Sequence, residues 1–316
     1  MAHLSTVLGP VHPEELGVAA IHEHIMGGLP RWDCDPGFWY NTGKVLEKCY
    51  DDLIDFKLLD KQTYVDCSDI GMERDLDVYV KLAASIRPIH IVASTGFGGD
   101  KGIAPHFRKK DADYFEALFV RELTQGMGHT GIKAGVISIG SDGGELTDLE
   151  EKIYRAAARA AKRTGAAVLM GGSHTTLGQL DTLAREKLDP SRIIVSHLNG
   201  SGRIDMEYDR QIIRAGAYVA YDDIGVQDWS RRPYRMPDER RVDLLLSMTK
   251  AGLQDHVLLS TGSRSHSLSW GEPSLHNVGH LFRYFLPAMR HAGVGEDLIH
   301  KILVENPKRV LPIQQG

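Results

Sequence analysis

Cysteine is scarce in this chain, and the few cysteines form no recognisable pattern. Cys34, Cys49 and Cys67 are odd in number, and none belongs to a CxxC spacing. A disulfide framework or a thiolate zinc site would need paired or closely spaced cysteines. We therefore expect neither, and we interpret the three cysteines as small buried residues.

The chain also lacks an excess of basic charge and a long apolar run. It has 37 lysines and arginines against 42 aspartates and glutamates, and the two signs are interleaved. Nucleic acids and anionic membranes are bound by clustered basic residues, so we expect neither as a partner. No apolar run approaches the ~20 residues that cross a bilayer, and Met1 to Leu8 does not resemble a secretion signal. We expect a cytoplasmic protein.

No Pro/Ser-rich or low-complexity linker interrupts the sequence, which predicts one domain over residues 1–316. With 42% hydrophobic and 25% charged residues, the composition is that of a soluble globular protein. What the sequence does contain is a regular alternation of short apolar runs with helical patterns. Eight of the runs are expected to be strands: 18–21, 63–66, 90–94, 135–139, 167–170, 193–197, 218–221 and 257–260.

Helical patterns lie between most of these runs. We expect helices over residues 44–59, 74–85, 111–126, 147–163, 177–187 and 238–251, with two more near 277–292 and 296–305. Thr147 and Glu150 have the spacing of a capping box, and Gly252 suits the left-handed position after a helix end. Eight strand–helix units with apolar strands predict an α/β fold of the TIM (β/α)8 barrel type. An open doubly wound sheet is less favoured, because no GxGxxG follows the first strand.

Two histidines, His22 and His24, stand at the end of the first predicted strand. Residues i and i+2 of a strand point to the same face, so both imidazoles can converge on one metal ion. The alternative is that two of fifteen histidines fall together by chance. TIM barrels assemble their active sites at the C-terminal ends of the strands, and His197 ends the sixth strand. Three histidines at one barrel mouth favour a functional site over chance.

Several motifs carry a resemblance to a known family. They are Thr6–Pro10 and Pro13–Gly17 leading to His22-Glu23-His24, then Val92–Phe97, Lys133–Ile137, Leu149–Lys152, Gly178–Asp181, Ser196–Leu198 and Glu305–Pro307. Over nearly its whole length the sequence resembles the phosphotriesterase family of the amidohydrolase superfamily. The resemblance implies a barrel with a binuclear centre, usually of zinc, that activates water against phosphotriesters, lactones or related esters.

The resemblance assigns only half of the family's metal ligands to this chain. The retained ligand positions are His22, His24 and His197. The bridging position of strand four falls on Ser138, the histidine of strand five on Gly171, and the aspartate of strand eight on Gly262. Two dications about 3.5–4 Å apart would repel each other without an anionic bridge. We therefore do not expect a binuclear centre.

Three hypotheses remain for the function. In the first, the three histidines hold a single Zn²⁺ or similar cation with water in the fourth position, as in a hydrolase acting on an ester, lactone or phosphoester. In the second, the same histidines act without metal as general acid and base in a lyase, cyclase or isomerase. In the third, the barrel is inactive and serves as a binding or structural protein. We expect a homodimer and, for either enzyme, a small-molecule substrate.

Further residues are candidates for the barrel mouth. Asp222 and Asp223 follow the seventh strand, where either could replace the missing carboxylate or merely cap a loop. Arg74 could clamp an anionic group, although an ion pair at a helix start is the more frequent role. The other candidate substrate-binding residues are Phe97, Ser138, Gly171, His174, Gly262, His266 and Trp270. The small residues at 138, 171 and 262 should widen the pocket, and His266 with Trp270 should cover it.

Overall fold

The main sheet of the protein is a parallel barrel sheet. The computed structural model describes residues 2–28, 35–37, 39–54, 56, 61–72, 74–86, 88–171, 176–198, 206–226, 237–268 and 276–314. Within them, nine strands pair in parallel in the order β10-β9-β8-β7-β6-β5-β4-β3-β11. Their bounds are β3 (Val18–Gly28), β4 (Gln62–Asp66), β5 (Ile89–Phe97), β6 (Val136–Ile139), β7 (Ala167–Gly171), β8 (Ile193–Ser196), β9 (Tyr218–Tyr221), β10 (Val257–Leu259) and β11 (Arg264–Leu268). The predicted TIM barrel is confirmed.

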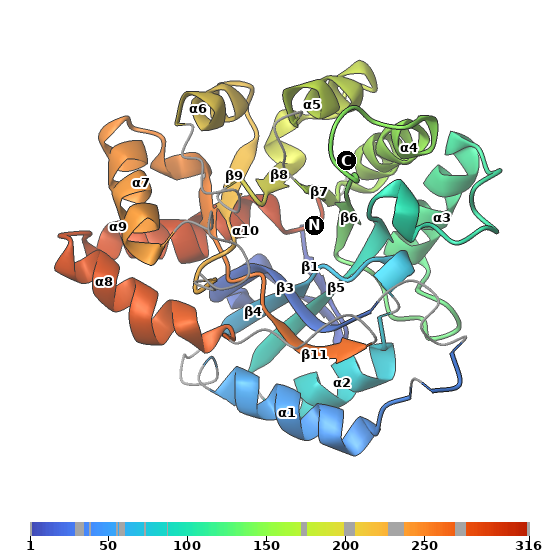
Figure 1. Ribbon diagram of the computed structural model, residues 1–316, viewed down its shortest axis with the longest axis horizontal. Helices are drawn as coiled ribbons and strands as arrows, with labels where there is room; N and C mark the ends of the chain where they lie inside the picture. The colour runs from blue at the N-terminus through green and yellow to red at the C-terminus, as the bar shows by residue number, and fades with distance from the viewer. Residues whose placement is uncertain are drawn as a thin grey trace.

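Helices surround these strands (Figure 1). Their bounds are α1 (Thr42–Ile54), α2 (Leu76–Ser85), α3 (Ala112–Thr124), α4 (Asp148–Thr164), α5 (Thr176–Arg185), α6 (Met206–Arg214), α7 (Asp238–Lys250), α8 (Leu286–His291), α9 (Glu296–His300) and α10 (Asn306–Val310). Thr147 and Glu150 form the predicted capping box of α4, with reciprocal hydrogen bonds. Among the described helices, none is long and apolar enough to cross a bilayer.

Four helices and strands of the described structure were not predicted from the sequence. They are α6, the paired strands β1 (Leu4–Thr6) and β2 (Gly9–Val11), and β11. The first strand is also longer than predicted, because β3 continues past the barrel rim to pair with β11. His24 therefore pairs with Arg264 inside a strand and does not lie at a strand end.

The alternation of side chains along the strands shows which residues face the barrel interior. One buried apolar cluster includes Val136, Leu169, Ala220 and Leu258, whereas their strand neighbours pack in the larger cluster with the helices. Residues two further along a strand point to the same face. This rule places positions 138, 171, 222 and 260 on the inner wall, at the C-terminal mouth.

The barrel closes between β3 and β10 through a seam of individual hydrogen bonds. The backbone N–H of His22 donates to Ser260 Oγ (2.9 Å), and the N–H of Gly262 donates to His22 O (3.1 Å). Two residues further along β3, the backbone N–H of His24 donates to Ser263 O (2.8 Å). The segment after β10 is thereby held against the strand that carries both histidines.

Glu23 is the centre of this seam. Its side chain is fully buried. Oε1 accepts hydrogen bonds from Ser260 Oγ and from the N–H and Oγ1 of Thr261, while Oε2 accepts from Thr261 Oγ1 and from the N–H and Oγ of Ser263, all at 2.7–2.8 Å. Hydrogen bonds to a charged acceptor are about twice as strong as neutral ones. Glu23, which lies between the two histidines, therefore anchors residues 260–263 after β10.

Replacing Glu23→Gln should lower the free energy of unfolding by about 2–4 kcal/mol, because an amide N–H₂ would face backbone donors that now meet a carboxylate oxygen. The measurement is the midpoint of urea unfolding. Glu239→Gln, an exposed position on α7, serves as the control and should leave the midpoint unchanged. Equal midpoints for both variants would contradict an anchoring role for Glu23.

Candidate metal and active site

Three histidines from two strands meet at the barrel mouth. His22 and His24 lie on β3, and His197 follows β8. The ring centroids of His22 and His24 are 5.3 Å apart, and those of His22 and His197 are 4.6 Å apart. His22 and His24 are buried, whereas the His197 side chain is 44% exposed. The structure thus brings together the three histidines that the sequence singled out.

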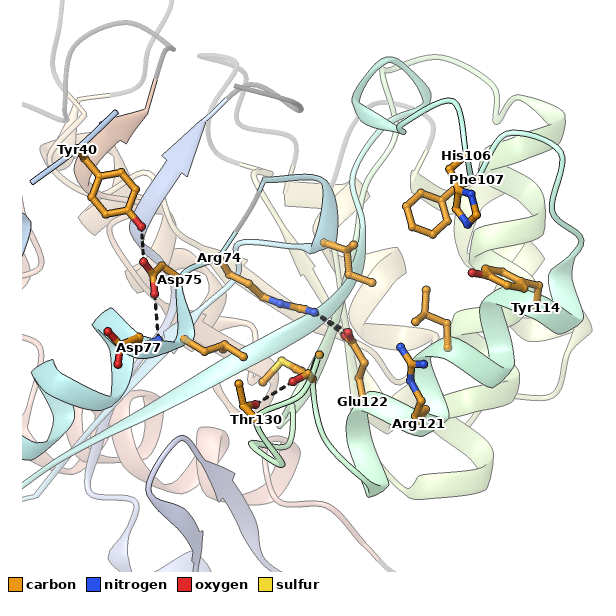
Figure 2. A pocket seen from close by; sticks show the side chains of 15 residues that line it. Tyr40, Arg74, Asp75, Asp77, His106, Phe107, Tyr114, Arg121, Glu122 and Thr130 are labelled. Atoms are coloured by element: carbon orange, nitrogen blue, oxygen red, sulfur yellow. Dashed lines mark hydrogen bonds and ion pairs between the residues drawn. The ribbon is translucent and has the colours of Figure 1, made fainter. Parts of the chain in front are cut away.

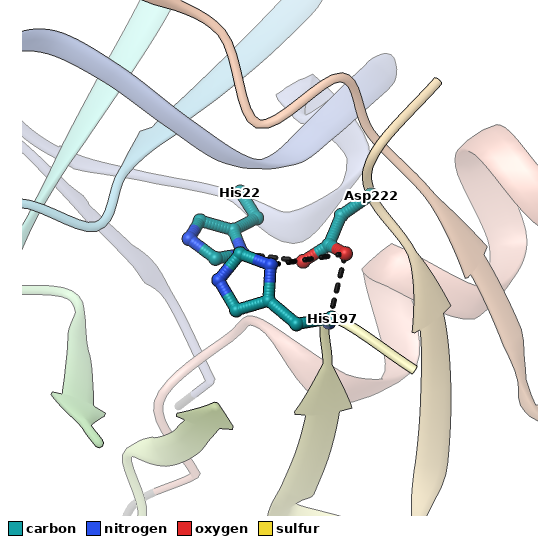
Figure 3. Close-up of side chains that lie close together, drawn as sticks. All are labelled: His22, His197 and Asp222. Atoms are coloured by element: carbon teal, nitrogen blue, oxygen red, sulfur yellow. Dashed lines mark hydrogen bonds and ion pairs between the residues drawn. The ribbon is translucent and has the colours of Figure 1, made fainter. Parts of the chain in front are cut away.

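Asp222, directly after β9, connects two of these histidines (Figure 3). Its Oδ2 is 2.5 Å from His22 Nδ1, and its Oδ1 accepts the backbone N–H of His197 at 2.8 Å. The carboxylate has no exposed surface. Because a buried charge is stable only when it is paired and hydrogen-bonded, Asp222 and the two histidine positions support one another.

The electrostatics of this pair favour its charged form. Burial alone would lower the pKa of His22, but the charge and hydrogen bond of Asp222 outweigh it and the pKa is raised. Burial likewise raises the pKa of Asp222, but the neighbouring His197 and His22 bring it below the usual value. His24 differs, since burial and the nearby His22 and Arg264 lower its pKa well below the usual value. His24 is thus a neutral imidazole.

The hydrogen bonds also indicate which ring nitrogens carry protons. Ser68 Oγ donates to Met26 O (2.8 Å), so it accepts from His24 Nδ1 (3.1 Å). His22 Nδ1 correspondingly donates to Asp222. In the neutral ring of His24 the Nε2 atom is left as the acceptor, and in His22 Nε2 can accept or bind a cation once it carries no proton. Metal-binding histidines are oriented in this way, with the second nitrogen donating to a carboxylate or another oxygen.

His197 has an unusual backbone. Its φ is +59°, in the left-handed region, where among the described residues other than glycine only Lys187 also lies. This conformation costs energy for a side chain with a Cβ atom, and such residues cluster at functional sites. It explains why β8 ends at Ser196, one residue before the predicted end. The N–H bond to Asp222 holds the kink.

A model of the phosphotriesterase family matches residues 2–311. The chain belongs to the phosphotriesterase family. It is 29% identical over 334 aligned residues to a phosphotriesterase homology protein of Mycobacterium tuberculosis, covering 100% of this chain and 99% of that protein. An N-acetyltaurine hydrolase of Xenopus tropicalis is 25% identical, over 98% and 97% of the two chains. One similar solved structure is 27% identical in sequence, with a TM-score of 0.88 over 98% of this chain and 99% of that chain. It comes from the molecular engineering of organophosphate hydrolysis activity from a weak promiscuous lactonase template.

Family membership implies a binuclear centre, which the residues of this chain do not fit. Ser138 and Gly171 lie on the inner wall at two of the implied ligand positions, and neither offers the carboxylate, carbamate or imidazole expected there. A Cβ at Gly171 would have ordinary contacts, 3.9 Å from Gly140 Cα and His197 Cδ2, so among the described residues there is room for at least a methyl group at this position. With no anionic bridge between them, two dications have no site here.

Gly262 is constrained by its own backbone. Its φ is +57°, and a Cβ there would lie 2.6 Å from the carbonyl oxygen of Asp222. The same Cβ would be 3.8 Å from Asp223 Oδ1. A side chain at 262 therefore requires the end of β9 to move, which is not the case at Gly171.

The donor set that remains fits one ion. His22, His197 and Asp222 offer donor atoms that all lie within 4.8 Å of one another, a grouping found once in the described parts of the chain. His24 lies beside this group, with Nε2 as its acceptor nitrogen. Imidazole and carboxylate ligands suit Zn²⁺ and similar divalent ions. A single cation at the histidines is therefore compatible with the residues present.

Arg74 lies in a different place from the histidines. Its Nη2 forms an ion pair with Glu122 of α3, at 2.7 Å to each carboxylate oxygen, and its Nη1 donates to Ser94 O. The pair lines a separate pocket of about 710 Å³. Tyr40 and Tyr114 line the same pocket (Figure 2). The side chains of Arg74 and Glu122 are 9% and 5% exposed. This is the structural ion pair that the sequence offered as the alternative, so we do not include Arg74 in the proposed site.

The other candidate residues lie in different parts of the structure, and one of those described, Asp223, is at the mouth beside His197. Phe97 is 1% exposed and packs against Phe107, with ring centroids 4.9 Å apart, and so belongs to the core behind the wall. His266 lies on β11 beside Tyr40, with ring centroids 6.3 Å apart. Asp223 lies at the mouth, with Oδ1 3.9 Å from His197 Nδ1. The candidates His174 and Trp270 lie outside the described residues.

Two residues with roles at the site were not identified as such from the sequence. Ser68 orients His24, and Glu23 anchors the seam. A serine one residue past the second strand carries no signal of its own in a single sequence. Glu23 carried a weak one, because a charged residue inside an apolar strand must be paired if it is buried.

Alanine substitutions at Gly171 and Gly262 form a matched pair that tests the backbone assignment. Gly262→Ala should lower the free energy of unfolding by about 1–2 kcal/mol from the left-handed conformation alone, with the contact to Asp222 adding to this. Gly171→Ala should be neutral or slightly stabilising. Thermal unfolding of both variants measures the difference. Equal destabilisation would contradict the conformation described for Gly262.

Replacing Arg74→Met should destabilise the protein by about 3–5 kcal/mol, because Glu122 would be left buried and unpaired. The double variant Arg74→Met/Glu122→Leu should recover most of this loss. Urea unfolding of the three proteins measures the coupling. If the single variant kept full stability and lost only substrate affinity, Arg74 would bind substrate after all.

Proposed function

We propose that this protein is a metal-dependent hydrolase with one divalent cation, Zn²⁺ or a similar ion, held by Nε2 of His22, Nε2 of His24 and the imidazole of His197. One observation supports this above the others. Asp222 and Ser68 accept the Nδ1 protons of His22 and His24, which directs both Nε2 atoms away from their partners in the manner of metal ligands.

The proposed substrates contain an ester, lactone or phosphoester bond. One similar protein is named an N-acetyltaurine hydrolase, and a similar solved structure is described in terms of organophosphate hydrolysis and a lactonase template. These names concern bonds at a carbonyl or phosphoryl centre. A bound divalent cation supplies Lewis acidity and activates water at neutral pH. Ser138 and Gly171 are small residues on the inner wall of the mouth, and we infer that they admit a substrate larger than a family-type centre would.

The chain's own residues supply orientation in this scheme. Asp222 fixes the tautomer of His22 and holds His197 through its backbone, so one buried carboxylate positions two of the three imidazoles. Ser68 fixes His24 and is itself held by Met26 O. Preorganised ligands bind a cation without an ordering cost at the time of binding.

A second candidate function uses no metal. The His22–Asp222 pair is also the arrangement in which a buried carboxylate orients a histidine that acts as a general base. Such a site would suit a lyase, cyclase or isomerase. An inactive barrel is the remaining alternative, in which neither the cation nor the pair has a chemical role.

Metal analysis of protein purified without chelator should find close to one zinc per chain. Replacing zinc by Co²⁺ should give the visible spectrum of a four-coordinate site, which reports the ligands independently of activity. His24→Ala should lower metal affinity more than Asp222→Asn, for which a 10–100-fold loss is expected from an outer hydrogen-bond partner. The reverse order would make Asp222 the ligand in place of His24.

Two other outcomes would overturn the proposal. Two metals per chain would contradict the exclusion of a binuclear centre. Metal-free protein that still turns over a substrate would favour the acid/base enzyme. Turnover can be assayed with 4-nitrophenyl acetate, δ-valerolactone, diethyl 4-nitrophenyl phosphate and N-acetyltaurine. Asp243→Asn on the exposed side of α7 is the control for every assay.

We also propose a cytoplasmic homodimer. Trp39 and Tyr284 are 76% and 61% exposed, and large aromatic side chains of this kind are enriched in protein interfaces. Light scattering coupled to size exclusion measures the oligomeric state directly.

A further inference from the structure

The position after β10 cannot provide a carboxylate in this backbone. Gly262 has a left-handed conformation, and a Cβ there would approach the carbonyl of Asp222. The resemblance to the family places the proton-accepting aspartate at this position. Hydrolysis by the proposed site would therefore need an acceptor from elsewhere.

A carboxylate from the neighbouring strand reaches the same place. Position 262 and Asp223 follow β10 and β9, which pair in parallel, so both residues emerge at the same edge. The Cβ that Gly262 lacks would contact Asp223 Oδ1 at 3.8 Å. An aspartate at 262 would bring its own carboxylate against that of Asp223.

The two aspartates after β9 differ in availability. Both oxygens of Asp222 are engaged by His22 and His197, and the side chain has no exposed surface. The Asp223 side chain is 13% exposed, and within the described structure its carboxylate accepts no hydrogen bond. Its near neighbour is His197 Nδ1, at 3.9 Å. Asp223 is thus the carboxylate that can meet a water molecule or a substrate.

We propose that Asp223 is a catalytic residue of the hydrolase. Its carboxylate, which follows β9, takes over the role of the aspartate that is missing at position 262 after β10. This rests on the proposed function. A water O–H bond breaks, its proton passes to Asp223, and the water oxygen forms a bond to the carbonyl carbon or phosphorus of the substrate. The bond to the leaving oxygen then breaks, and the proton passes from Asp223 to that oxygen. Water and the ester are consumed, an acid and an alcohol are produced, and Asp223 is regenerated.

Asp223→Asn tests this role, because the amide keeps the size of the side chain and cannot accept the proton. For a lactone such as δ-valerolactone, whose leaving group is an alkoxide, kcat should fall by ~100-fold or more. The loss should be smaller for 4-nitrophenyl acetate, because 4-nitrophenolate leaves without a proton. Zinc content and the Co²⁺ spectrum should be unchanged. Asp223→Glu should keep more activity than Asp223→Asn, and Asp243→Asn should keep all of it.

Each alternative result has a definite consequence. Activity of Asp223→Asn equal to that of Asp243→Asn overturns the role of Asp223, while the hydrolase itself stands. Loss of zinc together with activity shows that Asp223 supports the metal site and overturns its role in proton transfer. Equal losses for both leaving groups overturn the delivery of the proton to the leaving oxygen. If the unmodified protein hydrolyses no substrate of the panel, the proposed function fails and Asp223 falls with it.

Discussion

The geometry of the site depends on the hydrogen bonds that Glu23 accepts across the barrel seam. One buried carboxylate holds the backbone and side-chain donors of residues 260–263 against β3. His22 and His24 flank it on the same strand, and Gly262 lies within the segment it holds. One set of hydrogen bonds therefore positions both the histidines of β3 and the segment after β10. If either moved, the other would move with it. The strand pair β3–β11 extends this connection beyond the rim.

Charge at the mouth limits what this site can hold. Ser138 and Gly262 provide no negative charge, and among the described residues the carboxylates within 4 Å of the ring nitrogens of the three histidines, Asp222 and Asp223, both follow β9. Asp222 is committed to His22 and His197. The charge of a single dication is half balanced by Asp222 and fully balanced once Asp223 is added, whereas a second dication about 3.5–4 Å away would meet uncompensated repulsion of several kcal/mol even at a moderate dielectric constant. The electrostatics thus lead to the same conclusion as the ligand count.

The barrel was predictable from the sequence because its strands are short, apolar and separated by clear helical patterns. The cap at Thr147 could be located from local chemistry alone. What could not be predicted depends on contacts between residues far apart in the chain. Arg74 and Glu122 are 48 residues apart, and His22 and Asp222 are 200 apart. The left-handed backbone of His197 gave no sign in the sequence either, because a histidine there is compatible with a strand until its N–H partner is known.

The neighbouring ends of β9 and β10 show how a barrel can keep a functional group while losing it from its usual strand. In a parallel barrel, adjacent strands deliver their following residues to the same rim, so positions in different loops can serve one point in space. Residues 223 and 262 are such a pair: they are 39 positions apart in the chain, and a Cβ at position 262 would lie 3.8 Å from Asp223 Oδ1. An alignment of each strand with its family counterpart shows only that Gly262 lacks a carboxylate. It does not show that the carboxylate of Asp223 lies beside that position. For this family, the group that occupies a point in the mouth is therefore a better guide to chemistry than the residue at one aligned position.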